Sequence, residues 1–248
     1  MIDQTLATPS LDVGTLAIAA PHGRSRLVEI SCRALDIAGS ALLLVLLSPL
    51  LAAIALAIRL DSPGPAVFRQ QRIGRDRRPF TVNKFRSMHD GAAHDRHREF
   101  VLGLIRGEHP QHDLPDHEAA DQDAADDGPR PYYKMIADPR ITRVGRVLRR
   151  SSLDELPQLW NVLRGDMSLV GPRPAIPYEV DHYPSAWLDR LAVKPGITGL
   201  WQVSGRSQVT LQEMVRLDVD YARRRTLWLN LWILVHTVPT VLGGKGAW

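Results

Sequence analysis

Cysteine is almost absent from the sequence. Cys32 is the only one, so no disulfide can form within the chain, and this usage fits a reducing compartment. The first 23 residues lack a basic segment followed by a long apolar core, which argues against a secretory signal peptide. Internal repeats are also missing. A content of 44% hydrophobic and 23% charged residues excludes a wholly disordered chain. The 248 residues therefore predict one large folded domain or two small ones.

Charge is unevenly distributed along the chain. Residues 94–127 contain ten acidic and three basic side chains, which gives this segment a net charge of −7. Because the whole chain has a net charge of +4, the rest of the chain has a net charge of +11. A basic body of this kind favours an anionic partner, such as nucleic acid, a phosphorylated small molecule or an acidic lipid surface. Nucleic acid is the weakest of these because the sequence contains no recognition motif for it.

One long stretch, residues 37–58, contains no charge at all. As a straight helix its 22 residues would be about 33 Å long, enough to cross a hydrocarbon core of about 30 Å. Pro49 stands in the middle of the stretch, however, where it removes a backbone donor and kinks or breaks a helix. Ser48 beside it carries a hydroxyl that can satisfy a freed backbone group.

Positive charge flanks this apolar stretch on both sides. Arg24, Arg26 and Arg33 precede it, and six arginines between Arg59 and Arg78 follow it. Because positive flanks mark the cytoplasmic side, a helix-break-helix hairpin that enters and leaves on that face explains both flanks. A proline-kinked spanning helix and a buried core helix are the alternatives that the residues leave open.

The remaining segments predict further helices and one small β element. Turn residues at 62–65 and alternation at 67–69 and 80–82 predict two short strands joined by a hairpin around 74–78. The acidic segment 94–127 holds five histidines in no zinc-binding spacing, so we interpret it as a solvated or disordered variable loop. Residues 209–225 have helical spacing. Trp228 and Trp232 begin a short apolar helix that suits either the membrane interface or a core.

Four arginines recur at every third position before the most polar part of the chain: Arg140, Arg143, Arg146 and Arg149. This spacing places them on or near one helical face. That face is either simply solvated or directed at phosphate or lipid headgroups, and the spacing alone does not separate the two interpretations.

The stretch SSLDELP (151–157) is the densest in reactive groups. Ser152 and Glu155 match a capping box, which predicts that Asp154 and Glu155 lie at a helix N-terminus, and simple capping would explain both acids. The chemical alternative is that this end, preceded by Arg149, binds phosphate while a carboxylate attacks phosphorus or holds magnesium. In GPRP (171–174), flanking prolines stiffen the turn that carries Arg173, which suits a side chain that must grip an anion.

Three motifs in order show a specific resemblance. They are KFRSM (84–88), DPRITRVGRVLRRSSLDELPQLWNVLRGDMSLVGPRP (138–174) and KPGITGLWQVSGR (194–206). In order and wording they resemble the bacterial sugar transferases. These are monotopic polyprenyl-phosphate phosphoglycosyl transferases of the undecaprenyl-phosphate glucose/galactose phosphotransferase type, which start exopolysaccharide, capsule and O-antigen repeat units. The resemblance covers roughly residues 33–248.

The resemblance implies a mechanism and its residues. The family's Asp-Glu signature falls on Asp154 and Glu155. By resemblance, Asp154 attacks the β-phosphate of a UDP-sugar, releases UMP and holds the phosphosugar covalently until polyprenyl phosphate accepts it. Glu155 would assist in metal binding or proton removal, and Mg²⁺ would be the cofactor, with Asp154 and Glu155 as its ligands. The family's basic positions match Lys84, Arg86, Arg173 and Arg206. Together with Arg149, these residues would neutralise the nucleotide and lipid phosphates.

The resemblance also implies a location and partners. Family members use a re-entrant helix broken at a Ser-Pro pair, matched here by Ser48 and Pro49, on the cytoplasmic face of the bacterial inner membrane. The expected partners are a UDP-sugar (glucose or galactose favoured, N-acetylated sugars left open), polyprenyl phosphate and membrane lipids, with a homo-oligomer compatible. Because only a short tail precedes the motifs, we expect the minimal form of the family. The competing hypothesis is a non-catalytic scaffold of a polysaccharide assembly complex.

Together these observations predict a mainly α fold with a small β-hairpin, in a monotopic membrane protein. Residues 1–32 are expected to be a flexible N-terminal tail and residues 33–60 a re-entrant membrane helix. Residues 61–248 are expected to form a cytoplasmic catalytic domain with the variable loop 94–127 and a C-terminal interfacial amphipathic helix.

Overall fold

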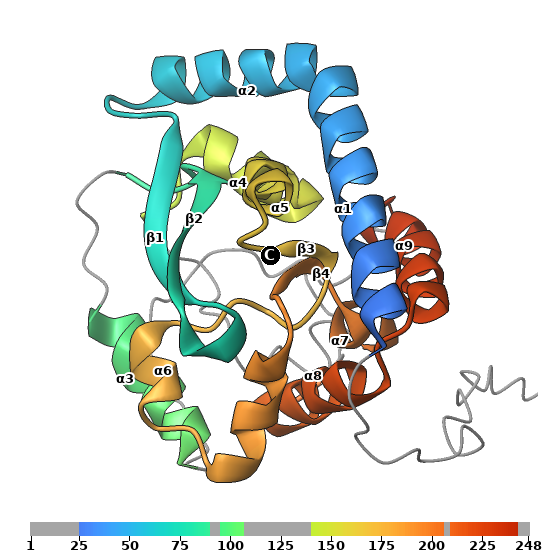
Figure 1. The fold of residues 1–248 in the computed structure, drawn as a ribbon. Helices are drawn as coiled ribbons and strands as arrows, with labels where there is room; N and C mark the ends of the chain where they lie inside the picture. Colours follow the sequence, from blue (N-terminus) through green and yellow to red (C-terminus); the bar gives the residue numbers. More distant parts are fainter. Residues whose placement is uncertain (1–24, 90–94, 107–139, 206–208, 243–248) are drawn as a thin grey trace, which may run out of the picture.

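The computed structural model describes residues 25–89, 95–106, 140–205 and 209–242, which form mainly helices with two small sheets (Figure 1). The α-helices are α1 (Arg26–Leu46), α2 (Ser48–Asp61), α3 (Asp95–Ile105), α4 (Arg143–Ser151), α5 (Gln158–Arg164), α6 (Pro177–Val180), α7 (Leu200–Ser204), α8 (Leu211–Arg224) and α9 (Leu227–Leu242). The strands are β1 (Val67–Ile73), β2 (Pro79–Phe85), β3 (Ser168–Val170) and β4 (Gly196–Thr198), and the 3₁₀ segments are η2 (Arg75–Arg77), η3 (Leu153–Glu155) and η4 (Ser185–Ala192). The predicted mainly α fold with a β-hairpin around 74–78 is confirmed.

The first two helices form the predicted helix-break-helix hairpin. α1 ends at Leu46, α2 begins at Ser48, and the two are bent by 63°. Pro49 stands in the first turn of α2, where its missing N–H removes no helical hydrogen bond. The Ser48 hydroxyl donates to the Val45 carbonyl at 2.8 Å and so satisfies a backbone acceptor at the end of α1. The break therefore falls where the sequence places it.

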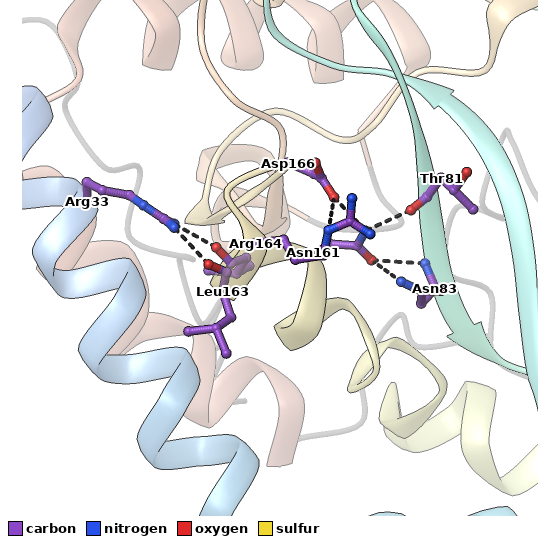
Figure 2. Close-up of polar contacts among 8 residues, drawn as sticks. Arg33, Thr81, Asn83, Asn161, Leu163, Arg164 and Asp166 are labelled. Carbon is purple, nitrogen blue, oxygen red and sulfur yellow. Dashed lines mark hydrogen bonds and ion pairs between the residues drawn. The ribbon is translucent and has the colours of Figure 1, made fainter.

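Both arms of this hairpin pack on the same body of the molecule. On α1, Arg33 donates to the carbonyls of Val162 and Leu163 at 2.6 and 2.8 Å and closes the C-terminal end of α5 (Figure 2). At the end of α2, the Asp61 carboxylate accepts the Val144 N–H of α4 at 3.0 Å. Entry and exit of the apolar stretch therefore contact one body. The bent pair fits a re-entrant element.

The corner of the hairpin exposes apolar side chains. Val45, Leu46 and Leu50 are 72%, 63% and 40% exposed. On α9, which lies beside α1 in Figure 1, Trp228 is 77% exposed while Ile233 is fully buried. Among the described helices, none is by itself both long and apolar enough to cross a membrane, whereas α1 and α2 together meet both criteria. Exposed apolar side chains that cluster in this way are typical of an interaction surface.

The core lies where α1, α5, α8 and α9 close on the parallel pair β3 and β4, which is in register at Ser168↔Gly196 and Val170↔Thr198. Asp36 of α1 is buried and accepts from the Ser168 hydroxyl at 2.9 Å and the Leu169 N–H at 2.8 Å. The first arm of the hairpin is thereby tied to the strand that leads into the GPRP turn. The largest core side chains with at most 1% exposure are Tyr221, Met167, Ile233, Val82, Val162, Val170 and Val193.

Two boundaries differ from the sequence expectation. Helix α1 begins at Arg26, inside the segment 1–32 expected to be a flexible tail, because Glu29 forms an ion pair with Arg75 at 2.9 Å and Cys32 is fully buried. The acidic segment 94–127, expected to be a loop, begins with α3, which buries Val101 and Ile105 one turn apart. Residues 1–24 and 107–139 lie outside the described ranges.

Candidate active site

The Asp-Glu pair lies in the 3₁₀ turn η3, between α4 and α5. Ser152 ends α4 in a left-handed conformation with φ of 57°, and its N–H donates to the Arg149 carbonyl at 3.3 Å. Its side chain makes no capping hydrogen bond to the following turn, so the predicted capping box is wrong. The two carboxylates nevertheless lie just before a helix, half-buried on one short turn. That position leaves them accessible to a ligand while limiting their motion.

Lys84 is the basic group that the structure brings to this turn. Its Nζ lies 2.7 Å from Glu155 Oε1, and the two side chains are 28% and 33% exposed. The ammonium group neutralises Glu155 and fixes its orientation beside Asp154. An ion pair this exposed contributes little to the free energy of folding. The ion pair matters for position instead: it joins β2 to η3, and so brings the KFRSM motif next to the Asp-Glu pair.

Asn161 holds β2 and α5 together (Figure 2). Because Lys84 lies on β2 and η3 directly precedes α5, this contact also fixes the relative position of Lys84 and η3. It is fully buried, and its Oδ1 accepts from the Asn83 backbone N–H at 3.0 Å and from Asn83 Nδ2 at 2.9 Å. Its Nδ2 donates to the Thr81 carbonyl at 2.7 Å. These contacts use the edge of β2 that does not pair with β1. The amide therefore extends the sheet by one side chain and carries α5 with it.

Arg173 stands on the turn that follows β3, as the GPRP motif predicts, and Arg72 of β1 supports that turn. The buried Arg72 donates to the Pro174 carbonyl at 2.9 Å and to Gln70 Oε1 at 3.1 and 2.7 Å. Burial and the charge of Arg173 lower the pKa of Arg72 to about 10, while Glu179, then Tyr178 and to the smallest extent Glu155, oppose this shift. Arg72 thus stays charged at neutral pH and acts electrostatically on both Arg173 and the η3 turn.

Arg72 is a site residue that was not predicted from the sequence, where it counts only as a flanking charge. A signal for it exists in the strand register. Phe68 pairs with Lys84, Gln70 with Val82 and Arg72 with Phe80, so Arg72 and Lys84 belong to the same face of the hairpin. If the two strands are paired outward from the turn between them, the alternation of side chains along each strand places Arg72 and Lys84 on the same face.

The remaining predicted basic residues have different positions. Arg149 is half-buried in the last turn of α4, next to η3. Arg206 lies outside the described residues. Arg86 has a different role from the phosphate contact that the resemblance implies. Its guanidinium is buried and donates to the carbonyls of Ser62 and Pro63, both at 2.7 Å. Arg86 therefore closes the C-terminal end of α2 in place of the phosphate contact that the sequence predicted.

Two carboxylates are the acidic donors that the site offers to a metal. Among the described residues, no three His, Cys, Asp or Glu side chains come together as a metal cluster. Mg²⁺ is commonly held by one or two carboxylates with the remaining positions filled by substrate phosphates and water. Asp154 and Glu155 on one turn fit that donor set, whereas they do not fit a metal site built from protein ligands alone.

The chain matches a known protein family. The model of the family described as "Bacterial sugar transferase" matches residues 27–244. The chain is 38% identical, over 97% of its length and 80% of the relative's, to a UDP-glucose:undecaprenyl-phosphate glucose-1-phosphate transferase of Caulobacter vibrioides.

Two further relatives are longer proteins. The chain is 40% identical to the galactosyl transferase CpsE of Streptococcus agalactiae, over 88% of the chain and 43% of that protein. It is 40% identical to an undecaprenyl-phosphate galactose phosphotransferase of Salmonella typhimurium, over 87% of the chain and 41% of that protein. The chain thus spans less than half the length of these two relatives.

Proposed function

The chain belongs to the bacterial sugar transferase family and is by that membership a phosphoglycosyl transferase, and we propose that it moves a sugar-1-phosphate from a UDP-sugar to undecaprenyl phosphate. UDP-glucose and UDP-galactose are the favoured donors, because the similar relatives are named for glucose and galactose. The product would be the first lipid-linked sugar of an exopolysaccharide, capsule or O-antigen unit. The observation that carries the proposal is the Lys84–Glu155–Asp154 group, with Arg72 and Arg173 supplying further positive charge beside it.

In the first step, the Asp154 carboxylate attacks the β-phosphorus of the UDP-sugar. A P–O bond to the carboxylate forms, the bond from that phosphorus to the bridging oxygen breaks, and UMP leaves with the electron pair. Two anions must approach one another in this step, so positive charge near the phosphates is essential. Lys84 on β2 and Arg173 on the turn after β3 would supply it, and the contacts that hold that strand and that turn would limit the reorganisation needed.

In the second step, an oxygen of undecaprenyl phosphate attacks the same phosphorus, and the Asp154 carboxylate leaves unchanged. Glu155, oriented by Lys84, would hold Mg²⁺ together with Asp154, and the ion would offset charge on the diphosphate. The two-step route means that a water-soluble donor and a membrane-bound acceptor need not occupy the site together.

The test is release of UMP from a panel of UDP-sugars. With purified enzyme in detergent and no lipid acceptor, we expect a burst of UMP approaching the amount of enzyme, together with a protein adduct heavier by one phosphosugar. Undecaprenyl phosphate should then restore turnover. Release of UDP, or a first step that strictly requires lipid, would contradict the covalent route. If no UDP-sugar yields UMP, the chain is a non-catalytic scaffold.

We further propose that the exposed apolar corner of α1 and α2 enters the cytoplasmic leaflet of the bacterial inner membrane. Support comes from the exposed Val45, Leu46 and Leu50 and from the fact that both arms contact one body. Binding to lipid would remove this apolar area from water at about 25 cal/mol per Å².

A thiol-labelling experiment tests this orientation. In a Cys32→Ala background, Leu27→Cys and Asp181→Cys, both exposed, should resist an impermeant thiol reagent in intact cells and react after lysis. Labelling of the Leu27→Cys protein alone in intact cells would show a spanning helix, and labelling of both would place the domain outside the cytoplasm.

A further inference from the structure

A buried ion pair lies behind the GPRP turn. Arg190 of η4 and Asp218 of α8 are each about 1% exposed, and their guanidinium and carboxylate groups are in direct contact. Burial raises the pKa of Asp218, and the charge of Arg190 together with its hydrogen bond opposes that shift. Such a pair is expensive to bury and adds little net stability compared with apolar side chains of similar size. Its presence therefore needs an explanation other than folding free energy.

The pair holds the backbone of Arg173 through its carbonyl group. Arg190 Nη2 donates to the Arg173 carbonyl at 3.2 Å. The contact with Asp218 fixes the direction of the Arg190 guanidinium group that makes this hydrogen bond. The buried ion pair thus restrains the backbone of the residue that the GPRP motif singles out.

The same network continues along the chain after Arg173. Arg190 Nη1 donates to the Tyr183 hydroxyl at 2.9 Å, and that hydroxyl donates to Glu179 Oε2 at 3.1 Å. Glu179 Oε2 also accepts the Ile176 N–H at 3.1 Å. From the opposite side, Arg72 donates to the carbonyl of the residue after Arg173. The turn is therefore restrained at Arg173, Pro174 and Ile176 by side chains from η4, β1 and α6.

These contacts lead to an assignment beyond the residues of the sequence motifs. We propose that Arg190 and Asp218 are positioning residues that fix the Arg173 peptide so that its guanidinium meets the diphosphate of the nucleotide-sugar donor. This proposal rests on the proposed function, because it concerns the same diphosphate. Neither residue touches the substrate itself; both act through Arg173. A displacement of about 1 Å in a charged group that binds phosphate is enough to cost up to about 100-fold in rate.

A second ion pair on the same two elements provides the matched control. Asp189 of η4 and Arg223 of α8 lie 2.7 Å apart, with side chains 53% and 59% exposed, so they link η4 to α8 without touching the Arg173 turn. If the buried pair served only to join the two elements, Asp189→Asn should affect donor binding in the same way as loss of the buried pair does. If it positions Arg173, Asp189→Asn leaves donor binding unchanged.

The experiment measures binding of UDP, a non-reacting diphosphate, by calorimetry, together with the Tm, in the wild type and four variants. These are Arg173→Gln, the apolar double variant Arg190→Met/Asp218→Leu, the triple variant that combines them, and Asp189→Asn. We expect the double variant to weaken UDP binding about tenfold with little loss of Tm, and the triple variant to bind no worse than Arg173→Gln, because the pair acts through that residue. KM for the donor should rise in parallel.

The outcomes separate the two proposals. Additive losses in the triple variant, or wild-type binding in the double variant, would overturn the positioning role while leaving the function intact. No effect of Arg173→Gln would also overturn the positioning role, whereas failure of the wild type to bind UDP would count against the proposed function itself. Should the apolar double variant not fold, Arg190→Lys answers the same question, since it keeps a cation beside Asp218 but lacks the second N–H group that reaches the Arg173 carbonyl.

Discussion

Replacing Asp154 by asparagine is expected to abolish release of UMP from the donor. The amide is neutral, lacks the nucleophilic oxygen that would bond to phosphorus, and cannot leave in the second step. Loss of a nucleophile typically lowers the turnover rate by a thousandfold or more, so we expect a fall of at least about 10³. Because the substitution keeps the shape of a half-buried side chain in η3, the Tm should change little. The measurement is the initial rate of UMP release alongside thermal unfolding.

Two companion variants give this result its meaning. Asp181→Asn, at an exposed position after α6, changes the net charge equally and should retain full activity. Glu155→Gln removes the partner of Lys84 but not the nucleophile, so it should lower the rate without eliminating the covalent adduct. A wild-type rate of UMP release in Asp154→Asn would refute the assignment of Asp154 as the nucleophile, whatever the behaviour of the other two.

Features with a local cause were predictable from the sequence. The break at Ser48 and Pro49 follows from the missing N–H of proline, and the β-hairpin follows from turn residues between alternating segments. The helix over residues 209–225 is confirmed by α8 because its apolar spacing is long and regular. In each case the signal and the structure occupy the same few residues.

The capping box shows where a local signal fails. A serine followed three residues later by glutamate is compatible with the start of a helix, but the same serine can end the preceding helix instead. Ser152 does the latter, in a left-handed conformation that few residues other than glycine and asparagine adopt readily. The pattern of letters is identical in both situations, and only the packing of α4 against its neighbours decides between them.

Arg86 and Arg72 show why the roles of basic residues were harder to assign. Both are buried arginines near the site motifs, and both donate to backbone carbonyls that are remote in sequence. Arg86 reaches the end of α2, whereas Arg72 reaches the turn after β3, about a hundred residues further along the chain. A guanidinium group suits phosphate and carbonyl oxygens equally well, so its partner depends on tertiary structure that the motif does not contain.

The largest expected effect on stability is that of Asn161→Ala. This change removes the fully buried amide that pairs with the Thr81 carbonyl and the Asn83 backbone N–H in part-buried hydrogen bonds, and it leaves a cavity there, so we expect a loss of about 3 kcal/mol in total. For a domain of this size, a loss of that magnitude lowers the Tm by roughly 6–12 °C. Activity should fall at temperatures well below the Tm as well, because Lys84 lies on β2 and the η3 turn directly precedes α5.

A comparison of two substitutions separates the hydrogen bonds of Asn161 from its volume. Asn161→Asp keeps the volume but places a carboxylate oxygen against the Thr81 carbonyl, 2.7 Å away in the native contact, so near neutral pH it should destabilise at least as much as alanine does. Its stability relative to Asn161→Ala should improve as the pH falls, since a protonated carboxyl regains a donor. Gln212→Ala, on the exposed face of α8, should leave the Tm unchanged. If Asn161→Asp were as stable as the wild type at neutral pH, the side chain would merely fill space, and the alignment of Lys84 with the η3 turn would have to come from the apolar contacts of α5 instead.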